Sequence, residues 1–203
     1  MNAAEDRGET MKENFIVLRS YENGRVVKAA EKESGRKVAV KRWEKTEAQS
    51  DLCRREQKVL SLLRHSAIPQ FAYTFEDERY SYMVSEWIEG ETLESYIRQT
   101  GPVSVREAER ILKKLYRILC YLHSHPQGPF VYGDLKPSNI LLVNETVYLV
   151  DFESVKILAS TEKDEQIECE EKTMVMGTAC FTAPEVFWGK AGCESDYYSL
   201  GAL

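Results

Sequence analysis

The chain has 203 residues, enough for one large domain or two small lobes with a buried core. Its 27 lysine and arginine residues against 33 aspartate and glutamate residues give a formal net charge of −6, which argues against a nucleic-acid-binding or membrane-surface protein. No apolar run reaches about 18 residues and the N-terminus lacks the apolar stretch of a secretory signal, so we expect neither a membrane segment nor export. The five cysteines are an odd number without metal-ligand spacing, which favours free thiols and a cytoplasmic location.

The first part of the chain is predicted to form an antiparallel sheet after a flexible tail over residues 1–13. Extended apolar or alternating runs recur, and Asn23-Gly24 between the first two is typical of a hairpin turn. Residues 46–64 instead place apolar side chains at helical spacing. This part therefore predicts one helix and five strands, at residues 15–18, 25–30, 37–41, 71–75 and 80–85.

The second part of the chain has a mainly helical pattern. Ser104 and Glu107 form a capping-box pair, and the apolar residues that follow recur at helical spacing up to His123. We expect His123, at the end of this helix, to be a surface or capping group. Two short strands are expected at residues 140–143 and 147–150. Strands first and helices later predict an α+β fold with two lobes.

The stretch from Tyr132 to Asn139 carries the residues that are most informative about chemistry. Asp134, Lys136 and Asn139 lie in a loop between a helix and a strand, and Asp151 follows the next apolar strand. Asn139 and Asp151 offer the oxygen ligands that Mg²⁺ prefers, while Asp134 is placed to accept a hydroxyl proton and Lys136 to neutralise a phosphoryl group. The arrangement is typical of phosphotransferases of the protein-kinase type.

The chain resembles the protein kinase family, because other motifs follow in the order that the family has. They are Val38-Ala39-Val40-Lys41, the hinge-like run Tyr82-Met83-Val84-Ser85-Glu86-Trp87-Ile88-Glu89-Gly90, Gly177-Thr178-Ala179-Cys180-Phe181-Thr182-Ala183-Pro184-Glu185 and Ser195-Asp196-Tyr197-Tyr198-Ser199-Leu200-Gly201. The resemblance covers residues 18–201 and is to eukaryotic-like serine/threonine kinases, among them those of bacteria, because Lys136 and Thr178 match the Ser/Thr-directed pattern.

The resemblance implies a two-lobed protein-kinase-like fold. Residues 14–86 would form the N-lobe, a five-stranded antiparallel sheet with one helix, and residues 87–203 a mainly helical C-lobe. The chain stops within the helix that carries Asp196, so the C-lobe is expected to be incomplete and truncated.

The resemblance also implies ATP and Mg²⁺ as cofactors, a protein Ser or Thr hydroxyl as acceptor, and a role for each matching residue. Lys41, held by Glu56, would anchor the α- and β-phosphates, and Asp134 and Lys136 would act at the hydroxyl and at the γ-phosphoryl group. Asn139 and Asp151 would hold Mg²⁺. The remaining implied positions are Gly24, Val26, Ala39, Glu86 and Ile88 around the nucleotide, Ser85 as gatekeeper, Asp196 as brace of the catalytic loop, and Thr178 in the activation segment.

Three motifs depart from the family pattern. The Gly-rich loop reads Arg19-Ser20-Tyr21-Glu22-Asn23-Gly24, so only its last glycine remains, and we expect weakened ATP binding. Tyr132-Gly133-Asp134 lacks the arginine that pairs with a phosphorylated activation loop, which leaves Thr161 and Thr173 in the acidic stretch without an obvious cationic partner. Asp151-Phe152-Glu153 has a glutamate where glycine-only torsions are common.

These departures keep two alternatives to an active protein kinase open. The eroded motifs also fit a pseudokinase that binds nucleotide as a scaffold without turnover. Gly133-Asp134 and Asp151-Phe152-Glu153 also resemble small-molecule phosphotransferases of the aminoglycoside or choline type. Those enzymes lack the run from Gly177 to Glu185 and the Ser195 helix, so an active protein kinase is the preferred interpretation.

Overall fold

The computed structural model describes residues 9–158, 178 and 180–203. The chain forms two compact units, Met1–Glu89 and Gly90–Leu203, so the boundary falls three residues after the predicted lobe boundary at residue 86. The first unit is a sheet with helices and the second is mainly helical, which confirms the α+β class. None of the helices within the described residues is long and apolar enough to cross a lipid bilayer.

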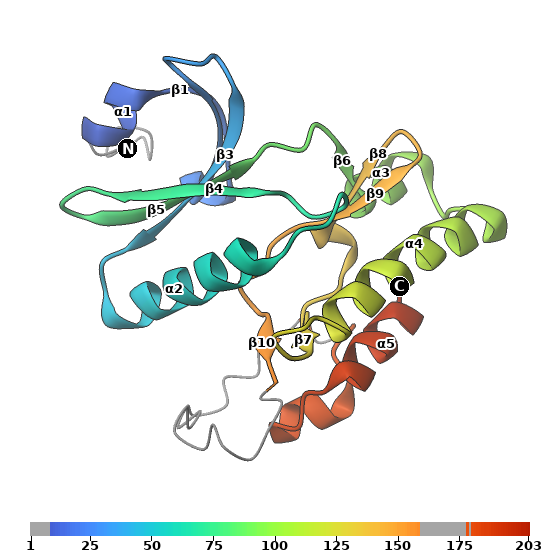
Figure 1. Cartoon of the computed structure of the whole chain (residues 1–203). Helices are drawn as coiled ribbons and strands as arrows, with labels where there is room; N and C mark the ends of the chain where they lie inside the picture. Colours follow the sequence, from blue (N-terminus) through green and yellow to red (C-terminus); the bar gives the residue numbers. More distant parts are fainter. Residues whose placement is uncertain (1–8, 159–177, 179) are drawn as a thin grey trace. The chain divides into compact units, whose positions relative to one another are not determined.

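The first unit contains a five-stranded antiparallel sheet in the order β1-β2-β3-β5-β4 (Figure 1). The predicted helix is α2, Glu47–Leu62, and it begins where the Thr46 hydroxyl accepts a hydrogen bond from the Gln49 N–H. All five predicted strands are present: β1 (Phe15–Tyr21), β2 (Val26–Glu31), β3 (Lys37–Glu44), β4 (Phe71–Glu76) and β5 (Tyr80–Glu86).

One face of this sheet carries the main apolar core of the unit. Val27 pairs with Val40 and Val40 with Val84, so their side chains share a face. A short helix, α1 (Glu9–Asn14), occupies residues that were expected to belong to the flexible tail. The reason is Met11, which is only 2% exposed and packs into this core. The apolar area that Met11 buries compensates for ordering a polar segment.

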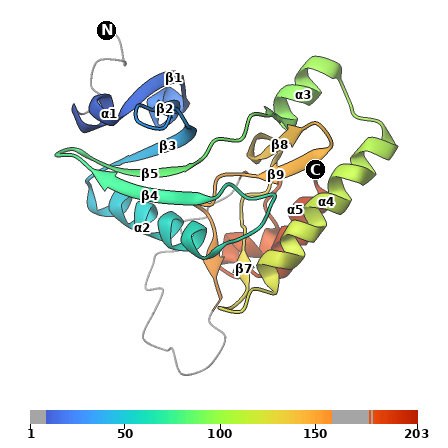
Figure 2. The same cartoon turned by 45° about the horizontal axis from the view of Figure 1, so that its top comes forward.

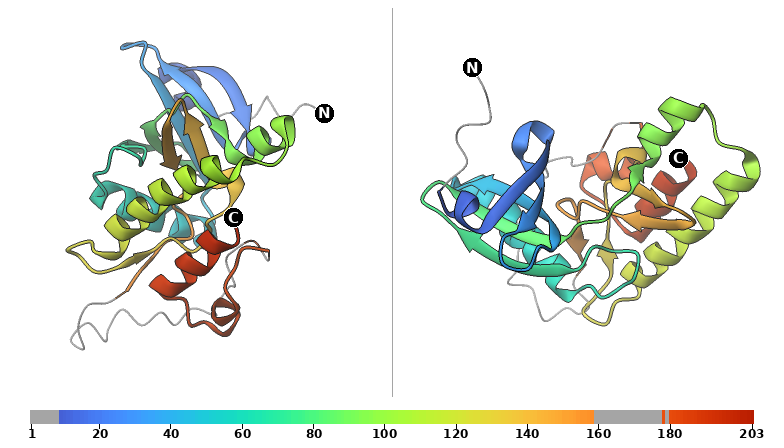
Figure 3. Two further views of the ribbon diagram at one scale, coloured as in Figure 1. Left: turned by 90° about the vertical axis from the view of Figure 1, so that its right-hand side faces the viewer. Right: turned by 90° about the horizontal axis from the view of Figure 1, so that it is seen from above.

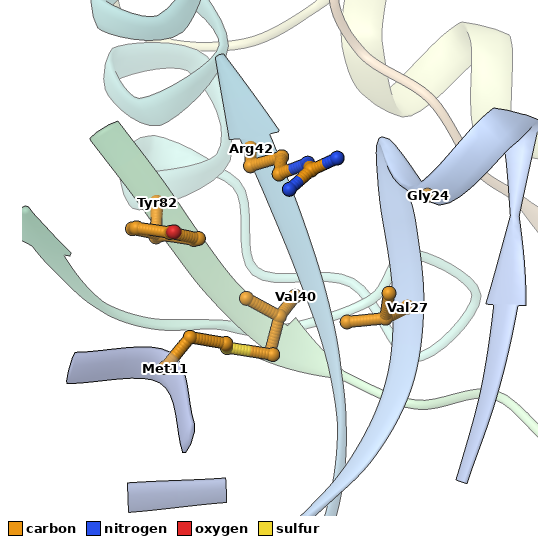
Figure 4. Close-up of a pocket in the computed structure, with 6 residues that line it drawn as sticks. All are labelled: Met11, Gly24, Val27, Val40, Arg42 and Tyr82. Carbon is orange, nitrogen blue, oxygen red and sulfur yellow. The ribbon is translucent and has the colours of Figure 1, made fainter. Parts of the chain in front are cut away.

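Figure 4 shows Met11 pointing towards Val40 at the base of a small cavity. The cavity has a volume of about 10 Å³, and its walls come from α1, the turn before β2, and strands β2, β3 and β5. A volume of this size holds at most one water molecule, so the cavity is a packing defect of the core and not a ligand site. Its lining residues are Met11, Gly24, Val27, Val40, Arg42 and Tyr82.

The predicted turn between β2 and β3 is fixed by a cluster of polar side chains around Glu31. Arg36 donates two hydrogen bonds to the Glu31 carboxylate, at 2.9 and 3.2 Å, and the Ser34 hydroxyl donates a third at 2.5 Å. The Tyr73 hydroxyl on β4 donates a fourth at 2.9 Å. These donors, Arg36 above all, lower the pKa of Glu31 to about 2. Burial, together with the hydrogen bond to Glu31, raises the pKa of Tyr73 to about 12.

A depressed carboxyl pKa stabilises the folded chain above the unfolded pKa, and this stabilisation is lost as the pH falls towards the folded value. Between pH 5 and pH 2 we therefore expect the free energy of unfolding of the wild-type chain to fall by about 1 kcal/mol more than that of Glu31→Gln, after discounting the pKa shift for solvent screening. Urea unfolding of both proteins at several pH values measures this difference. Glu33→Gln, on the same exposed turn, is the control, and its free energy of unfolding should depend on pH as that of the wild type does. The same pH dependence in all three proteins would contradict the prediction.

The second unit is built on the predicted helix α4, Val105–His123. The Ser104 hydroxyl caps it by accepting from the Glu107 N–H at 3.3 Å, and its buried face carries Ile111, Leu115, Ile118, Leu119 and Leu122. Helix α5, Cys193–Gly201, lies beside α4 (Figures 2 and 3). The predicted hairpin is β8 (Ile140–Val143) with β9 (Thr146–Leu149).

The elements of the second unit that sequence patterns did not predict are all short. Helix α3 follows the two-residue strand β6, which extends the β8–β9 hairpin to a three-stranded sheet, and β7 pairs with β10. Two- and three-residue elements have too few positions to show a period. Their bounds are β6 Glu91–Thr92, α3 Leu93–Thr100, β7 Phe130–Val131, η2 Pro137–Asn139, β10 Lys156–Ile157 and η3 Pro184–Trp188.

Candidate functional site

In the first unit, Lys41 on β3 and Glu56 on α2 form a buried ion pair. Lys41 Nζ lies 2.7 Å from Glu56 Oε2, and the two side chains are 9% and 3% exposed. The Lys41 ammonium also lies 5.3 Å from the centre of the Trp43 ring, on the same side of the strand. The carboxylate and the ring are thus two contacts that restrain the buried ammonium.

The predicted nucleotide residues of β2 and β3 share one sheet face with Lys41. Val26 pairs directly with Lys41, and Ala39 pairs with Ser85, so these four side chains project to the side opposite the Met11 core. Gly24 has a φ of +86°, a conformation that a side chain makes costly.

The segment after β5 carries the other two predicted nucleotide positions. Glu86 is the last residue of β5, and its N–H donates to the Gln70 carbonyl at 2.9 Å. Ile88 is buried at 8% exposure. The backbone of this segment is therefore fixed by Gln70, the residue before β4, and by the packing of Ile88.

In the second unit, three polar side chains converge on Asp134. Lys136 Nζ lies 2.6 Å from Asp134 Oδ2, and the Thr178 hydroxyl donates to Oδ1 at 3.3 Å. Asn139 Nδ2 donates to both the backbone carbonyl and Oδ2 of Asp134, at 3.0 and 3.1 Å. The structure thus brings Thr178, from a separate motif, to Asp134, Lys136 and Asn139, which the sequence analysis found in one stretch.

The predicted catalytic loop, residues 132–139, is held by Asp196 of α5. Asp196 is fully buried; its Oδ2 accepts from the Tyr132 N–H and its Oδ1 from the Gly133 N–H, both at 2.8 Å. Two charge-assisted bonds to consecutive backbone amides fix the loop two residues before Asp134. This contact is the bracing role that the resemblance implies for Asp196.

His123 is a partner of Asp196 and not the surface group that was expected. Its Nε2 lies 2.8 Å from Asp196 Oδ2, its Nδ1 lies 3.2 Å from the Tyr197 hydroxyl, and its side chain is 9% exposed. The expectation was wrong because it considered only the position near the helix end. His123 follows the buried Leu119 by four residues and so shares its face of α4, a spacing that could have revealed the burial.

Tyr132 connects the catalytic loop to the strand that precedes Asp151. Its side chain is fully buried, its hydroxyl donates to the Val150 carbonyl, and its ring packs edge-on against Phe152 at 5.5 Å. Burial and the nearby Asp151 charge raise the pKa of Tyr132, so the phenol stays protonated and can donate. Asp151 itself has a left-handed φ of +62°, uncommon outside glycine.

Gly133, where the family pattern has arginine, adopts a φ of +78°. A Cβ atom at this position would lie 3.2 Å from the Ser154 carbonyl oxygen. Glycine therefore relieves both torsional and steric strain at the point where Asp196 fixes the loop. Position 133 therefore carries no cationic side chain.

The end of the predicted activation segment is fastened to α5 by a serine that sequence reasoning missed. The Ser195 hydroxyl donates to Glu185 Oε1 at 2.7 Å, and Ser195 is 3% exposed. The acidic stretch 159–173, with Thr161 and Thr173, and the start of the run at Gly177 lie outside the described residues.

The residues of each unit fit the cofactors that the motifs imply. Both donor contacts of the Asn139 amide nitrogen go to Asp134, which turns the nitrogen towards the loop and makes the amide oxygen the atom suited to a cation. With the Asp151 carboxylate, this gives the oxygen donors that Mg²⁺ prefers. In the first unit, a buried lysine held by a carboxylate is suited to bind phosphate oxygens.

The chain matches the protein kinase domain family over residues 21–203. It is 33% identical over 183 residues to a probable serine/threonine-protein kinase zyg-1 of Caenorhabditis briggsae, an alignment covering 88% of this chain and 24% of that protein. It is also 33% identical over 192 residues to the serine/threonine-protein kinase PknA of Mycobacterium tuberculosis, covering 89% of this chain and 42% of PknA. The chain thus spans less than half the length of these relatives. Its family match, its sheet with the buried lysine and its braced catalytic loop lead to one assignment: the chain belongs to the protein kinase family.

Proposed function

We propose that the chain transfers the γ-phosphoryl group of ATP to Ser or Thr hydroxyls of a protein substrate. The observation that carries this proposal is the cluster on Asp134, in which Lys136, Asn139 and Thr178 all contact one carboxylate. The names of the relatives support the serine/threonine class, and the family match does not support a small-molecule phosphotransferase. The described cysteines carry free thiols, which supports action in the reducing cytoplasm.

In the proposed reaction, Asp134 orients the acceptor hydroxyl and takes its proton. The hydroxyl oxygen attacks the γ-phosphorus, the bond from that phosphorus to the β–γ bridging oxygen breaks, and ADP leaves. Lys136 neutralises charge on the phosphoryl group in transfer, and Lys41, positioned by Glu56, binds the α- and β-phosphates. Catalysis is then mainly positioning and electrostatic stabilisation.

Asn139 and Asp151 would hold Mg²⁺, which when bound neutralises negative charge on the phosphate oxygens. Both residues are fixed by the loop that carries Asp134: Asn139 through its amide, and Asp151 through the preceding Val150, whose N–H donates to the Asn139 carbonyl at 3.0 Å. The proton acceptor and the cation ligands therefore belong to one rigid part of the second unit.

The test measures the melting shift with Mg-ATP and the transfer of labelled γ-phosphate to a generic protein acceptor. Asp134→Asn should retain the ATP-dependent shift and lower transfer by about 10²- to 10⁴-fold, the usual contribution of a positioned acid–base group. Glu145→Gln, an exposed carboxylate at the β8–β9 turn, should behave as wild type. A shift without transfer in the wild-type chain would indicate a nucleotide-binding pseudokinase, and full transfer by Asp134→Asn would exclude the proposed role of Asp134.

A further inference from the structure

A row of aromatic and cationic side chains lies on the Lys41 face of the sheet in the first unit. Arg19 pairs with Lys28 and Tyr21 with Val26 across β1 and β2. Because Val26 in turn pairs with Lys41, the side chains of Arg19 and Tyr21 project to the same face as the proposed phosphate anchor. The family pattern has glycine at positions 19 and 21. This face therefore carries two large side chains where the family has none.

Tyr21 does not project freely from this face but packs against Trp87, in the segment after β5. The two ring centres are 5.5 Å apart with the planes inclined by 30°, within the range of favourable aromatic pairs. The guanidinium of Arg19 lies 5.1 Å from the Tyr21 ring centre and adds a cation–π contact from the other strand position.

Trp87 is itself held in place by Lys28. The Lys28 ammonium lies 5.2 Å from the Trp87 ring centre and 2.6 Å from Glu89 Oε2. The Glu89 carboxylate is drawn to the same ammonium, and this contact lowers its pKa. The row therefore runs from Arg19 through the two rings to Lys28 and Glu89, and it connects β1 to the predicted adenine-binding segment.

The turn that follows Tyr21 favours this arrangement. Glu22 and Asn23 have φ values of +48° and +55°, and Gly24 follows at +86°. Three consecutive left-handed residues make a very tight turn, so that Tyr21 and Val26 form the last pair of the β1–β2 ladder. The turn thus leaves the Tyr21 ring on the Lys41 face of the sheet, partly exposed.

We propose that Tyr21 is an internal competitor of the nucleotide, seated on Trp87 when no nucleotide is bound. Its ring stands on the same face as Val26, Ala39 and Lys41, packed against Trp87, and a purine nucleoside triphosphate binds there only after the ring has left Trp87. The apparent association constant for the nucleotide is then the intrinsic constant multiplied by the fraction of molecules in which the face is open. This inference rests on the proposed ATP-binding function.

The experiment compares the wild-type chain with Tyr21→Ala and Tyr21→Phe, using Mg-ATP as the probe in titration calorimetry. Tyr21→Ala should bind about tenfold more tightly, equivalent to about 1.4 kcal/mol. Tyr21→Phe retains the ring and should bind as wild type does. Tryptophan fluorescence without nucleotide provides a second readout, because removal of the ring changes the surroundings of Trp87 in Tyr21→Ala but not in Tyr21→Phe.

Equal or weaker binding by Tyr21→Ala, in a chain whose wild type binds Mg-ATP, would overturn the competitor role alone. Weaker binding in particular would mean that Tyr21 contacts the nucleotide directly. If neither the wild type nor Tyr21→Ala binds Mg-ATP, the proposed function fails and the inference fails with it. Thermal melting of all three proteins confirms that they are folded, which the partial exposure of Tyr21 leads us to expect.

Discussion

Asp196→Ala is expected to lower the free energy of unfolding by about 4 kcal/mol and to abolish phosphate transfer. The substitution removes the acceptor of the buried Tyr132 N–H and of the partly buried Gly133 N–H, and it removes the carboxylate beside His123. A buried donor that loses its only acceptor retains the full cost of its desolvation. Denaturant unfolding and the phosphate-transfer assay measure the two effects.

Two further variants distinguish the backbone hydrogen bonds of Asp196 from its contact with His123. His123→Ala removes one contact of Asp196 but leaves both backbone bonds, so we expect a smaller loss of stability, about 1–2 kcal/mol, and activity that is reduced but present. Asp196→Asn keeps the shape of the side chain and one acceptor oxygen, so its loss of stability should lie between those of His123→Ala and Asp196→Ala. Wild-type stability in Asp196→Ala would mean that the catalytic loop does not depend on this carboxylate.

Glu56→Gln is expected to cost about 3 kcal/mol of stability, since it removes the charge 2.7 Å from a buried ammonium. The Lys41 side chain keeps the cost of its burial and loses the attraction of the Glu56 carboxylate. Nucleotide affinity should fall as well, because Lys41 is no longer held at one position. Denaturant unfolding and Mg-ATP titration provide the two measurements.

The double variant Lys41→Met/Glu56→Leu tests the cause of this cost. Replacing both members of a buried ion pair by apolar groups of similar size is often neutral for stability. We therefore expect the double variant to unfold near the wild-type midpoint while binding no nucleotide. Glu47→Gln, in the exposed first turn of α2, should change neither quantity. If the double variant were less stable than Glu56→Gln, the pair would contribute through packing and not through charge.

The elements with a long regular period were those that the sequence predicted. The five strands alternate or form apolar runs between turn residues, and α4 combines a cap at Ser104 with an apolar stripe over its full length. Helix α1 was missed because Met11 is its one apolar anchor, and a single buried residue produces no period. Helix α3 was missed for a related reason, since Leu93 is its only fully buried residue.

The contacts of the candidate site are likewise of two kinds: those between residues close in sequence, which could be predicted, and those between distant residues, which could not. Asp134, Lys136 and Asn139 lie within six residues, so their meeting follows from the loop itself. The contact of His123 with Asp196 joins residues 73 positions apart, and that of Ser195 with Glu185 depends on how a short helix meets α5. Pairs of this kind depend on the packing of helices, which the local order of residues does not specify.

The hydrogen bond from Tyr132 to the carbonyl before Asp151 has a consequence for local unfolding. Tyr132 is also fixed by Asp196 through its own N–H, so one side chain and one amide join α5, the catalytic loop and the end of β9. Opening any of these three segments exposes a buried phenol and breaks bonds in the others. They should therefore exchange their amide hydrogens as one cooperative unit, with a common rate and a common dependence on denaturant.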